Sequence, residues 1–212
     1  MMTEHEERVA RRGRPSASSR ETLEEAALEL FLEQGYEQTS ASDIARRAGV
    51  ARSSFFNYFT AKADVLWVGL DPLLAEVPPR LEAAATELVS RGAPKRGDGL
   101  ETLRKVLLEI ADTVQPETVR WAGSLRSVAG TSADLAATGT KRALAQQSAL
   151  TDFLARAEPG LGPLQRTVCA GSIISATIAA TVFWIEEGPT RGSFSSVVDE
   201  ASAPIFRAYS AG

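Results

Sequence analysis

Apolar residues follow a helical period between residues 19 and 34. They recur at positions i, i+4, i+7 and i+8, as Leu23, Ala27, Leu30 and Phe31, which places them on one face of a helix. Ser18 and Glu21 have the spacing of a capping box, and Gly35 stands where a helix commonly ends. The pattern therefore predicts a helix over residues 19–34, with its glutamates pointing away from the apolar face.

Two shorter helices are predicted directly afterwards, over residues 41–48 and 52–59. Thr39 and Ser40 precede Asp43 with capping-box spacing, which marks the start of the first. The segment between the two helices, Ala48 to Ala51, contains Gly49 and is long enough only for a tight turn. Two short helices joined by such a turn are typical of a helix-turn-helix.

The second of these helices, in the stretch "AGVARSSFFNYF", has a polar head and an aromatic tail. Phe55 and Phe59 are four residues apart and share one helix face, so we expect them to be buried near Ile44 and Val50. A recognition helix enters the major groove with its N-terminal residues. The outward residues here have side chains that suit base edges: Arg52, Ser53, Ser54 and Asn57.

The remaining two thirds of the chain have helical periodicity throughout, without alternating strand-like runs. Glycine and proline clusters, including Pro78-Pro79, divide this part into predicted helices near 62–76, 80–91, 100–114, 117–129, 133–157, 163–187 and 194–209. The fold class predicted is all-α.

The longest uncharged run, residues 168–185, has the sequence "VCAGSIISATIAATVFWI". Eighteen residues would barely span a bilayer, and this run contains several glycines, serines and threonines. We expect a helix of a soluble protein that is covered on several sides, with no membrane span. Small residues four apart, Gly171 with Ser175 and Ala176 with Ala180, allow a second helix to approach closely.

Composition narrows the function further. The 212 residues include one cysteine, Cys169, and one histidine, His5, which argues against disulfides, histidine-rich metal sites and triads with a core histidine. A carboxylate-only enzyme stays open. However, Glu186-Glu187 and Asp199-Glu200 are adjacent pairs whose members point in different directions on a helix. We therefore predict no enzyme, no metal and no cofactor, in a cytosolic protein without a secretory signal.

Charge is segregated along the chain although the net charge is −4. Residues 8–20 contain five arginines, residues 21–43 contain seven acids, and residues 44–62 contain four basic residues and no acid. A fold that brings the two basic segments together would form a local positive surface on an acidic protein. The alternative is that they are ordinary solvated faces. An acidic helical module that binds protein rather than DNA is a further alternative.

The stretch "TSASDIARRAGVARSSFFNYFTAKADVL", residues 39–66, resembles the DNA-binding domain of TetR-family bacterial transcriptional regulators. The resemblance implies a helix-turn-helix domain over residues 18–62 and a ligand-binding and dimerisation domain over 63–212. It implies that Arg52, Ser53, Ser54 and Asn57 face DNA and that Thr39, Tyr58 and Lys62 hold phosphates. Two positions depart from the family pattern: Ala51 lacks a capping hydroxyl, and Phe56 replaces a common phosphate-binding tyrosine.

Residues 1–17 form a basic arm in this interpretation. Arg12-Gly13-Arg14-Pro15 resembles arms that place arginine in the minor groove of A/T-rich DNA, so Arg14 is a candidate DNA contact. A merely solubilising tail is the alternative.

The resemblance also implies a homodimer on a palindromic operator in double-stranded DNA, paired through the last two long helices; an intramolecular core helix is the alternative. The predicted protein is a cytoplasmic, nucleoid-associated repressor that a small, largely apolar effector releases. Some features of the sequence are similar to those of actinobacterial regulators of the mycofactocin type. Some of those regulators respond to long-chain acyl-CoA, so a fatty acyl-CoA is one candidate effector. Pockets between bundled helices are mostly apolar with a few polar groups, and the candidate lining residues are Trp67, Leu70, Trp121, Leu125, Phe153, Thr177 and Thr181.

Overall fold

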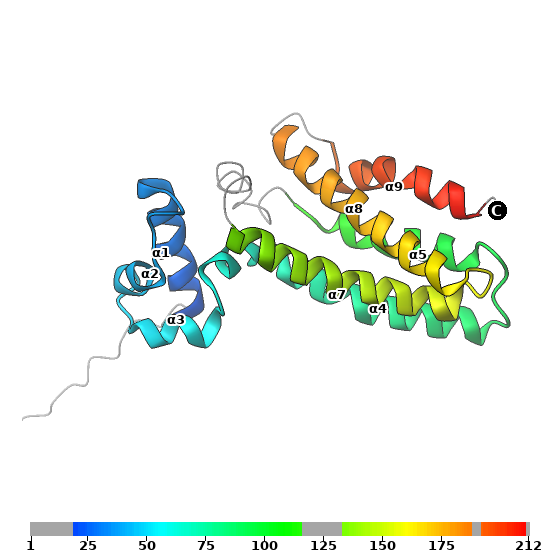
Figure 1. The fold of residues 1–212 in the computed structure, drawn as a ribbon, viewed down its shortest axis with the longest axis horizontal. Helices are drawn as coiled ribbons and strands as arrows, with labels where there is room; N and C mark the ends of the chain where they lie inside the picture. The colour runs from blue at the N-terminus through cyan, green and yellow to red at the C-terminus, as the bar shows by residue number, and fades with distance from the viewer. Residues whose placement is uncertain (1–18, 116–132, 188–191, 211–212) are drawn as a thin grey trace, which may run out of the picture. The chain divides into compact units, whose positions relative to one another are not determined.

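A computed structural model describes residues 19–115, 133–187 and 192–210 (Figure 1). The regular elements in these ranges are all helices, as the periodicity predicted. The chain forms two compact units, one ending at Thr60 and the other beginning at Ala61. Each unit has its own hydrophobic core and is described separately.

The first unit consists of α1 (Ser19–Gln34), α2 (Ala41–Arg47) and α3 (Arg52–Tyr58). These bounds confirm the predicted helices to within one residue. Gly35 and Gly49 end α1 and α2 with φ of 88° and 69°, a backbone conformation that glycine adopts without a steric penalty. The three helices enclose a core of buried apolar side chains: Leu23, Ala26, Ala27, Leu30, Phe31, Tyr36, Ile44, Ala45, Phe55 and Phe59.

The second unit begins with the 3₁₀ helix η1 (Lys62–Trp67) and continues with α4 (Asp71–Ser90), α5 (Asp98–Asp112), α7 (Ala133–Ala157), α8 (Pro163–Glu187) and α9 (Phe194–Ser210). The long helices pack side by side: α4 on α7, α7 on α8, and α9 on both α8 and α5 (Figure 1). The helix predicted near 117–129 lies outside the described residues.

The predicted break at Pro78-Pro79 is wrong, because α4 continues through both prolines. A proline inside a helix cannot donate to the carbonyl four residues earlier, so Pro78 leaves the carbonyl of Leu74 without its helical partner. Gln146 on α7 donates to that carbonyl from Nε2 at 3.0 Å. The neighbouring helix thus supplies the missing hydrogen bond, and α4 runs on as one element.

The N-terminus of α5 lies directly on the C-terminal end of α7. A Cβ built on Gly99 would come within 2.5 Å of the backbone oxygen of Ala157, so glycine permits this crossing. Next to it, the buried carboxylate of Glu158 accepts from the backbone N–H of Gly97 at 2.9 and 3.0 Å. This contact fixes the residue that precedes α5.

Helix α8 exposes an apolar stripe that the other described residues leave uncovered. One face packs on the core through Cys169, Ala170, Ile173, Ala180 and Trp184. The exposed side chains and their exposed fractions are Leu164 (76%), Val168 (48%), Ile178 (50%), Val182 (49%) and Phe183 (52%). The alternative of an entirely intramolecular core helix is therefore wrong for the described residues, whereas cover by a second protomer stays a prediction. By length and composition, α8 is also the one helix among the described residues that could cross a membrane.

Candidate DNA-binding surface

The tail of α3 is anchored in the core of the first unit. Phe55 is fully buried and Phe59 is 3% exposed, and their ring centroids lie 5.2 Å apart. Ile44, also buried, comes from α2. The predicted anchor is confirmed, and it fixes the rotation of α3 about its axis, which determines the residues that face outward.

The head of α3 and its outer face carry the predicted reading residues. Arg52, Ser53 and Asn57 are exposed, and Ser54 is half-buried. Tyr58, a predicted phosphate contact, is 45% exposed. One α-helix thus presents a guanidinium, a hydroxyl and an amide to solvent together, the groups that hydrogen-bond to guanine and adenine edges in a major groove.

Phe56 has a role that sequence reasoning missed. Its ring is 47% exposed and lies beneath the guanidinium of Arg52, whose Cζ is 5.1 Å from the ring centroid. The other neighbour of the ring is Phe55, in an edge-to-face contact at 5.3 Å. The i, i+4 spacing of Arg52 and Phe56 on one helix was the available signal. The Phe56 ring therefore lies against the guanidinium of Arg52 on the outer face of α3.

Ala51 stands at the N-cap of α3 and makes no side-chain capping bond. Its backbone is nevertheless in the extended conformation that a capping residue adopts (φ −69°, ψ 150°). The geometry of a cap is present without the hydroxyl, as the departure from the family pattern indicated.

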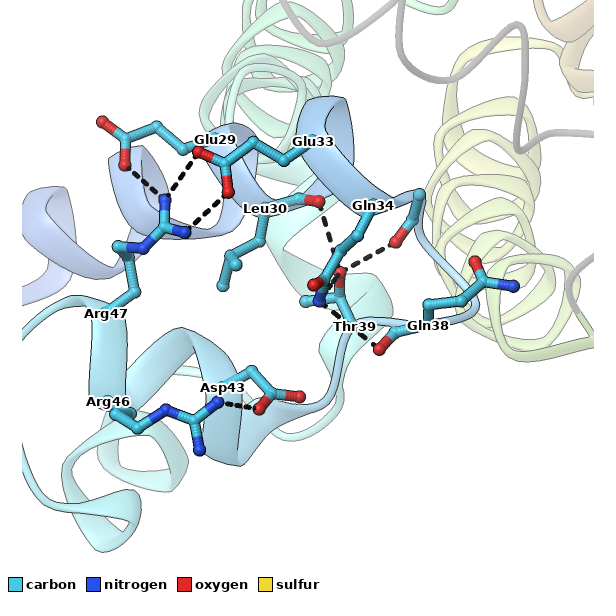
Figure 2. A network of polar contacts seen from close by, with 10 residues as sticks. Glu29, Leu30, Glu33, Gln34, Gln38, Thr39, Asp43, Arg46 and Arg47 are labelled. Carbon is cyan, nitrogen blue, oxygen red and sulfur yellow. Dashed lines mark hydrogen bonds and ion pairs between the residues drawn. The ribbon is translucent and has the colours of Figure 1, made fainter.

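Thr39 is placed differently from the other predicted contacts. Its side chain is buried, at 2% exposure, and its hydroxyl donates to the carbonyl of Gly35 at 2.8 Å while accepting from Gln34 Nε2 at 3.1 Å (Figure 2). The hydroxyl is used inside the unit and does not reach the surface. Sequence alone could not show this, because residues 39 and 40 both fit a cap.

Ser40 is the residue that caps α2, and its side chain is exposed. It accepts from the N–H of Asp43 at 3.1 Å, and Asp43 accepts from the Ser40 N–H at 3.0 Å, which completes the predicted capping box. Hydrogen bonds from the Ser40 hydroxyl and N–H lower the pKa of Asp43, and the charge of Arg46 adds to the effect. The carboxylate therefore stays ionised at the start of α2, where a negative charge stabilises a helix.

Two of the four basic residues of the second basic segment, Arg46 and Arg47, are paired with acids inside the first unit. Arg47 binds the carboxylate of Glu33 with two hydrogen bonds, at 3.0 and 2.6 Å, and that of Glu29 at 3.0 Å (Figure 2). The hydrogen bond from Arg47 lowers the pKa of Glu33, and Arg46 pairs with Asp43. For Arg46 and Arg47, the solvated-face alternative is therefore the better description. The i, i+4 spacing of Glu29 and Glu33 could have predicted a shared cation.

Two predicted DNA contacts lie outside the first unit as described. Lys62 opens η1 and belongs to the second unit, where its side chain is half-buried. Arg14 and the rest of the basic arm lie outside the described residues.

The predicted effector-binding residues that the structure describes lie in different parts of the second unit and do not share one set of contacts. Trp67 packs against α7, and its indole N–H donates to Thr138 Oγ1 at 3.0 Å. Leu70 packs in a cluster around Val114 and Trp184, whereas Phe153 is buried in the main core. The hydroxyls of Thr177 and Thr181 donate to carbonyls of their own helix, those of Ile173 and Thr177. Trp121 and Leu125 lie outside the described residues, so the predicted pocket stays a prediction.

A three-helix unit that anchors the tail of its third helix and exposes the polar head defines a helix-turn-helix DNA-binding protein. Residues 23–66 match the family model of bacterial regulatory proteins, tetR family. This match identifies the first unit as a TetR-family DNA-binding domain, and the curated relatives of the chain are transcriptional regulators rather than enzymes.

The chain is similar to known proteins and solved structures over most of its length. The proposed mycofactocin biosynthesis transcriptional regulator MftR of Mycobacterium tuberculosis is 26% identical over 185 residues, 86% of each protein. The SmeT–triclosan complex has a TM-score of 0.61 at 19% identity over 91% of each chain. Thermus thermophilus FadR, a TetR family repressor in complex with lauroyl-CoA, has a TM-score of 0.58 at 20% identity over 88% of this chain and 92% of its own. These likenesses establish the all-α fold.

Proposed function

We propose that the chain is a repressor that binds a palindromic operator as a homodimer and that a small, largely apolar effector releases it. The observation that carries this proposal is the rotation of α3. Phe55 and Phe59 face the core while Arg52, Ser53 and Asn57 face outward, which is the arrangement that major-groove reading requires. Tyr58 and Lys62 are the proposed phosphate contacts, and Ser40 takes the place given to Thr39, because its hydroxyl is at the surface.

Operator binding is tested by fluorescence anisotropy with labelled DNA from upstream of the protein's own gene. We expect binding that weakens with salt, because phosphate contacts release counterions. Arg52→Ala and Asn57→Ala should each weaken specific binding by about 1–3 kcal/mol if each residue reads a base. Leu32→Ala, on the exposed outer side of α1, is the matched control. Absence of any DNA binding would favour the acidic interaction module.

The dimer is supported by the exposed stripe on α8. Exposed apolar patches of this kind mark interaction sites, and a palindromic operator needs a two-fold symmetric protein. We expect Ile178→Glu combined with Phe183→Glu to yield a monomer in multi-angle light scattering, while Leu32→Glu in the first unit leaves the dimer intact. A dimer that survives the double substitution would place the interface elsewhere.

The effector class is supported by the acyl-CoA bound to the FadR neighbour. A fatty acyl-CoA is accordingly the first compound to test. Native mass spectrometry of the purified protein should show a bound molecule, and lauroyl-CoA should lower operator affinity in the anisotropy assay. If lauroyl-CoA has no effect, a co-purified molecule identifies the effector instead.

A further inference from the structure

Arg142 on α7 joins two acidic residues of the segment that follows the first unit. Its Nε and Nη2 bind the carboxylate of Asp71 at 2.6 and 2.7 Å, and its Nη1 donates to Asp64 Oδ1 at 3.2 Å. The Arg142 side chain is 18% exposed and that of Asp64 is 19% exposed. One guanidinium thus connects η1 and the first residue of α4 to the same position on α7.

Trp67 completes the surroundings of this guanidinium. The Cζ of Arg142 lies 4.8 Å from the centroid of the Trp67 ring, and the indole N–H donates to Thr138 one turn earlier on α7. Between them, Gly139 lets the ring approach, since a Cβ there would lie 3.1 Å from Trp67 Cζ2. The groups around Arg142 are therefore two carboxylates, an aromatic face and the Thr138 carbonyl, which accepts from Nη1 at 3.3 Å.

The charge of Arg142 is secured by these partners. Burial alone would lower the pKa of the guanidinium, but hydrogen bonds and charge from Asp71, and then from Asp64, raise it overall. A planar fork can bind one carboxylate with two parallel hydrogen bonds and still reach a second, a geometry that the single nitrogen of a lysine does not reproduce. The arginine is thus suited to holding both elements at once.

Asp64 extends this contact to the start of η1. Its Oδ1 accepts from Arg142, whereas its Oδ2 accepts from the backbone N–H of Ala61 at 2.9 Å. Lys62, the proposed phosphate contact, lies between Ala61 and Asp64 in the sequence. Asp64 therefore fixes the backbone on which Lys62 stands, and Arg142 fixes Asp64.

We propose that Arg142 is a positioning residue for DNA binding, which holds Lys62 in its phosphate-binding position through Asp64. This proposal rests on the proposed function. It assigns to α7, a helix of the second unit, an indirect part in the affinity for DNA. Any change that shifts Arg142 away from Asp64 releases the backbone of η1 and the lysine with it.

The test is a double-mutant cycle between Arg142 and Lys62, measured as operator affinity by anisotropy at several salt concentrations. Lys62→Ala should reduce the magnitude of the slope of log K against log salt by about 1 per protomer, and so by about 2 for the dimer, because each lysine neutralises one phosphate. Arg142→Gln should reduce the slope by the same amount, and Lys62→Ala should then add nothing further. Arg142→Lys, which keeps the charge but removes the fork, should reduce it as well.

Arg104→Gln is the matched control, because Arg104 forms a comparable two-bond pair with Asp199, at 2.7 and 2.7 Å, between α5 and α9. It should leave the slope unchanged even if it lowers the melting temperature. Hydrogen exchange of peptides covering residues 61–67 tests the proposal in the absence of DNA. Arg142→Gln should speed exchange in these peptides, and Arg104→Gln should not.

Unchanged exchange in Arg142→Gln would overturn the proposal, and so would additive losses in the cycle. If the wild-type protein binds no DNA, the proposed function fails. The hydrogen-exchange measurement still reports whether Arg142 holds η1.

Discussion

Gln146 donates to the backbone carbonyl of Leu74 at the one position in α4 where Pro78 removes the helical donor. Gln146→Leu leaves that carbonyl without this partner, at an expected cost of about 1–3 kcal/mol of unfolding free energy, measured by urea denaturation. Pro78→Ala restores a backbone N–H, so Gln146→Leu should cost less in that background. Equal costs in both backgrounds would show that the side chain does not replace the missing helical bond.

Gly99→Ala should destabilise the protein. Alanine has about 1 kcal/mol better helix propensity than glycine, but its Cβ would lie 2.5 Å from the Ala157 carbonyl oxygen, and neither backbone can move without disturbing the core. Overpacking of this kind costs about 1–3 kcal/mol or more, so the net change should be a loss. Gly160→Ala is the control, since its Cβ would meet atoms only at 3.8 Å. A tolerated Gly99→Ala would mean that α5 shifts freely on α7.

Ala51→Ser should supply the missing cap of α3. The backbone already has the capping conformation, so a hydroxyl there can accept from an N–H in the first turn and stabilise the protein by about 0.5–2 kcal/mol. Thermal unfolding measures the gain, and operator binding should tighten because the hydroxyl also reaches phosphate. Ala51→Val, without a hydroxyl, is the control. No change in either property would contradict this account of the cap.

Phe56→Ala should weaken operator binding through Arg52. An exposed cation–π contact contributes about 0.5–1 kcal/mol, so we expect roughly a two- to five-fold loss per protomer. Phe56→Tyr keeps the ring and should retain the contribution of Arg52. In the background of Arg52→Ala, Phe56→Ala should have little further effect, which the same anisotropy assay measures.

Stability should fall at alkaline pH because of Cys169. Burial raises the pKa of this thiol from 9.0 to about 11, and the charge of Glu158 adds to the shift. Between these values the unfolded chain releases the proton while the folded chain keeps it, so the free energy of unfolding decreases as pH rises through this window, by about 1 kcal/mol per pH unit. Cys169→Ala should lack this component. Parallel pH profiles for the two proteins would contradict the shift.

The elements that sequence predicted best are those with local signals at both ends. Residues 19–34 are bounded by a capping box and Gly35, and residues 163–187 by proline and glycine, and both helices were predicted with the observed bounds. The prediction failed at Pro78-Pro79, because the compensating donor is Gln146, 72 positions from Leu74. No local pattern carries that information.

The candidate DNA-binding surface shows the same division. The burial of Phe55 and Phe59 followed from a four-residue spacing on one helix. By contrast, the charge pattern places Arg47 in a basic patch, whereas the structure pairs it with Glu29 and Glu33. Thr39 and Ser40 both fit the N-cap of α2 by residue type and position. Only the packing of α1 on α2 decides which of the two hydroxyls is buried.

The uncovered apolar stripe of α8 has a consequence for gene control. If a second protomer covers it, the monomer exposes a surface that favours pairing, and the amount of dimer at low abundance rises with the square of the amount of protein. Operator occupancy then responds to abundance more steeply than one-to-one binding allows. A cell that doubles the protein would then nearly quadruple the dimer able to bind a two-fold symmetric DNA site.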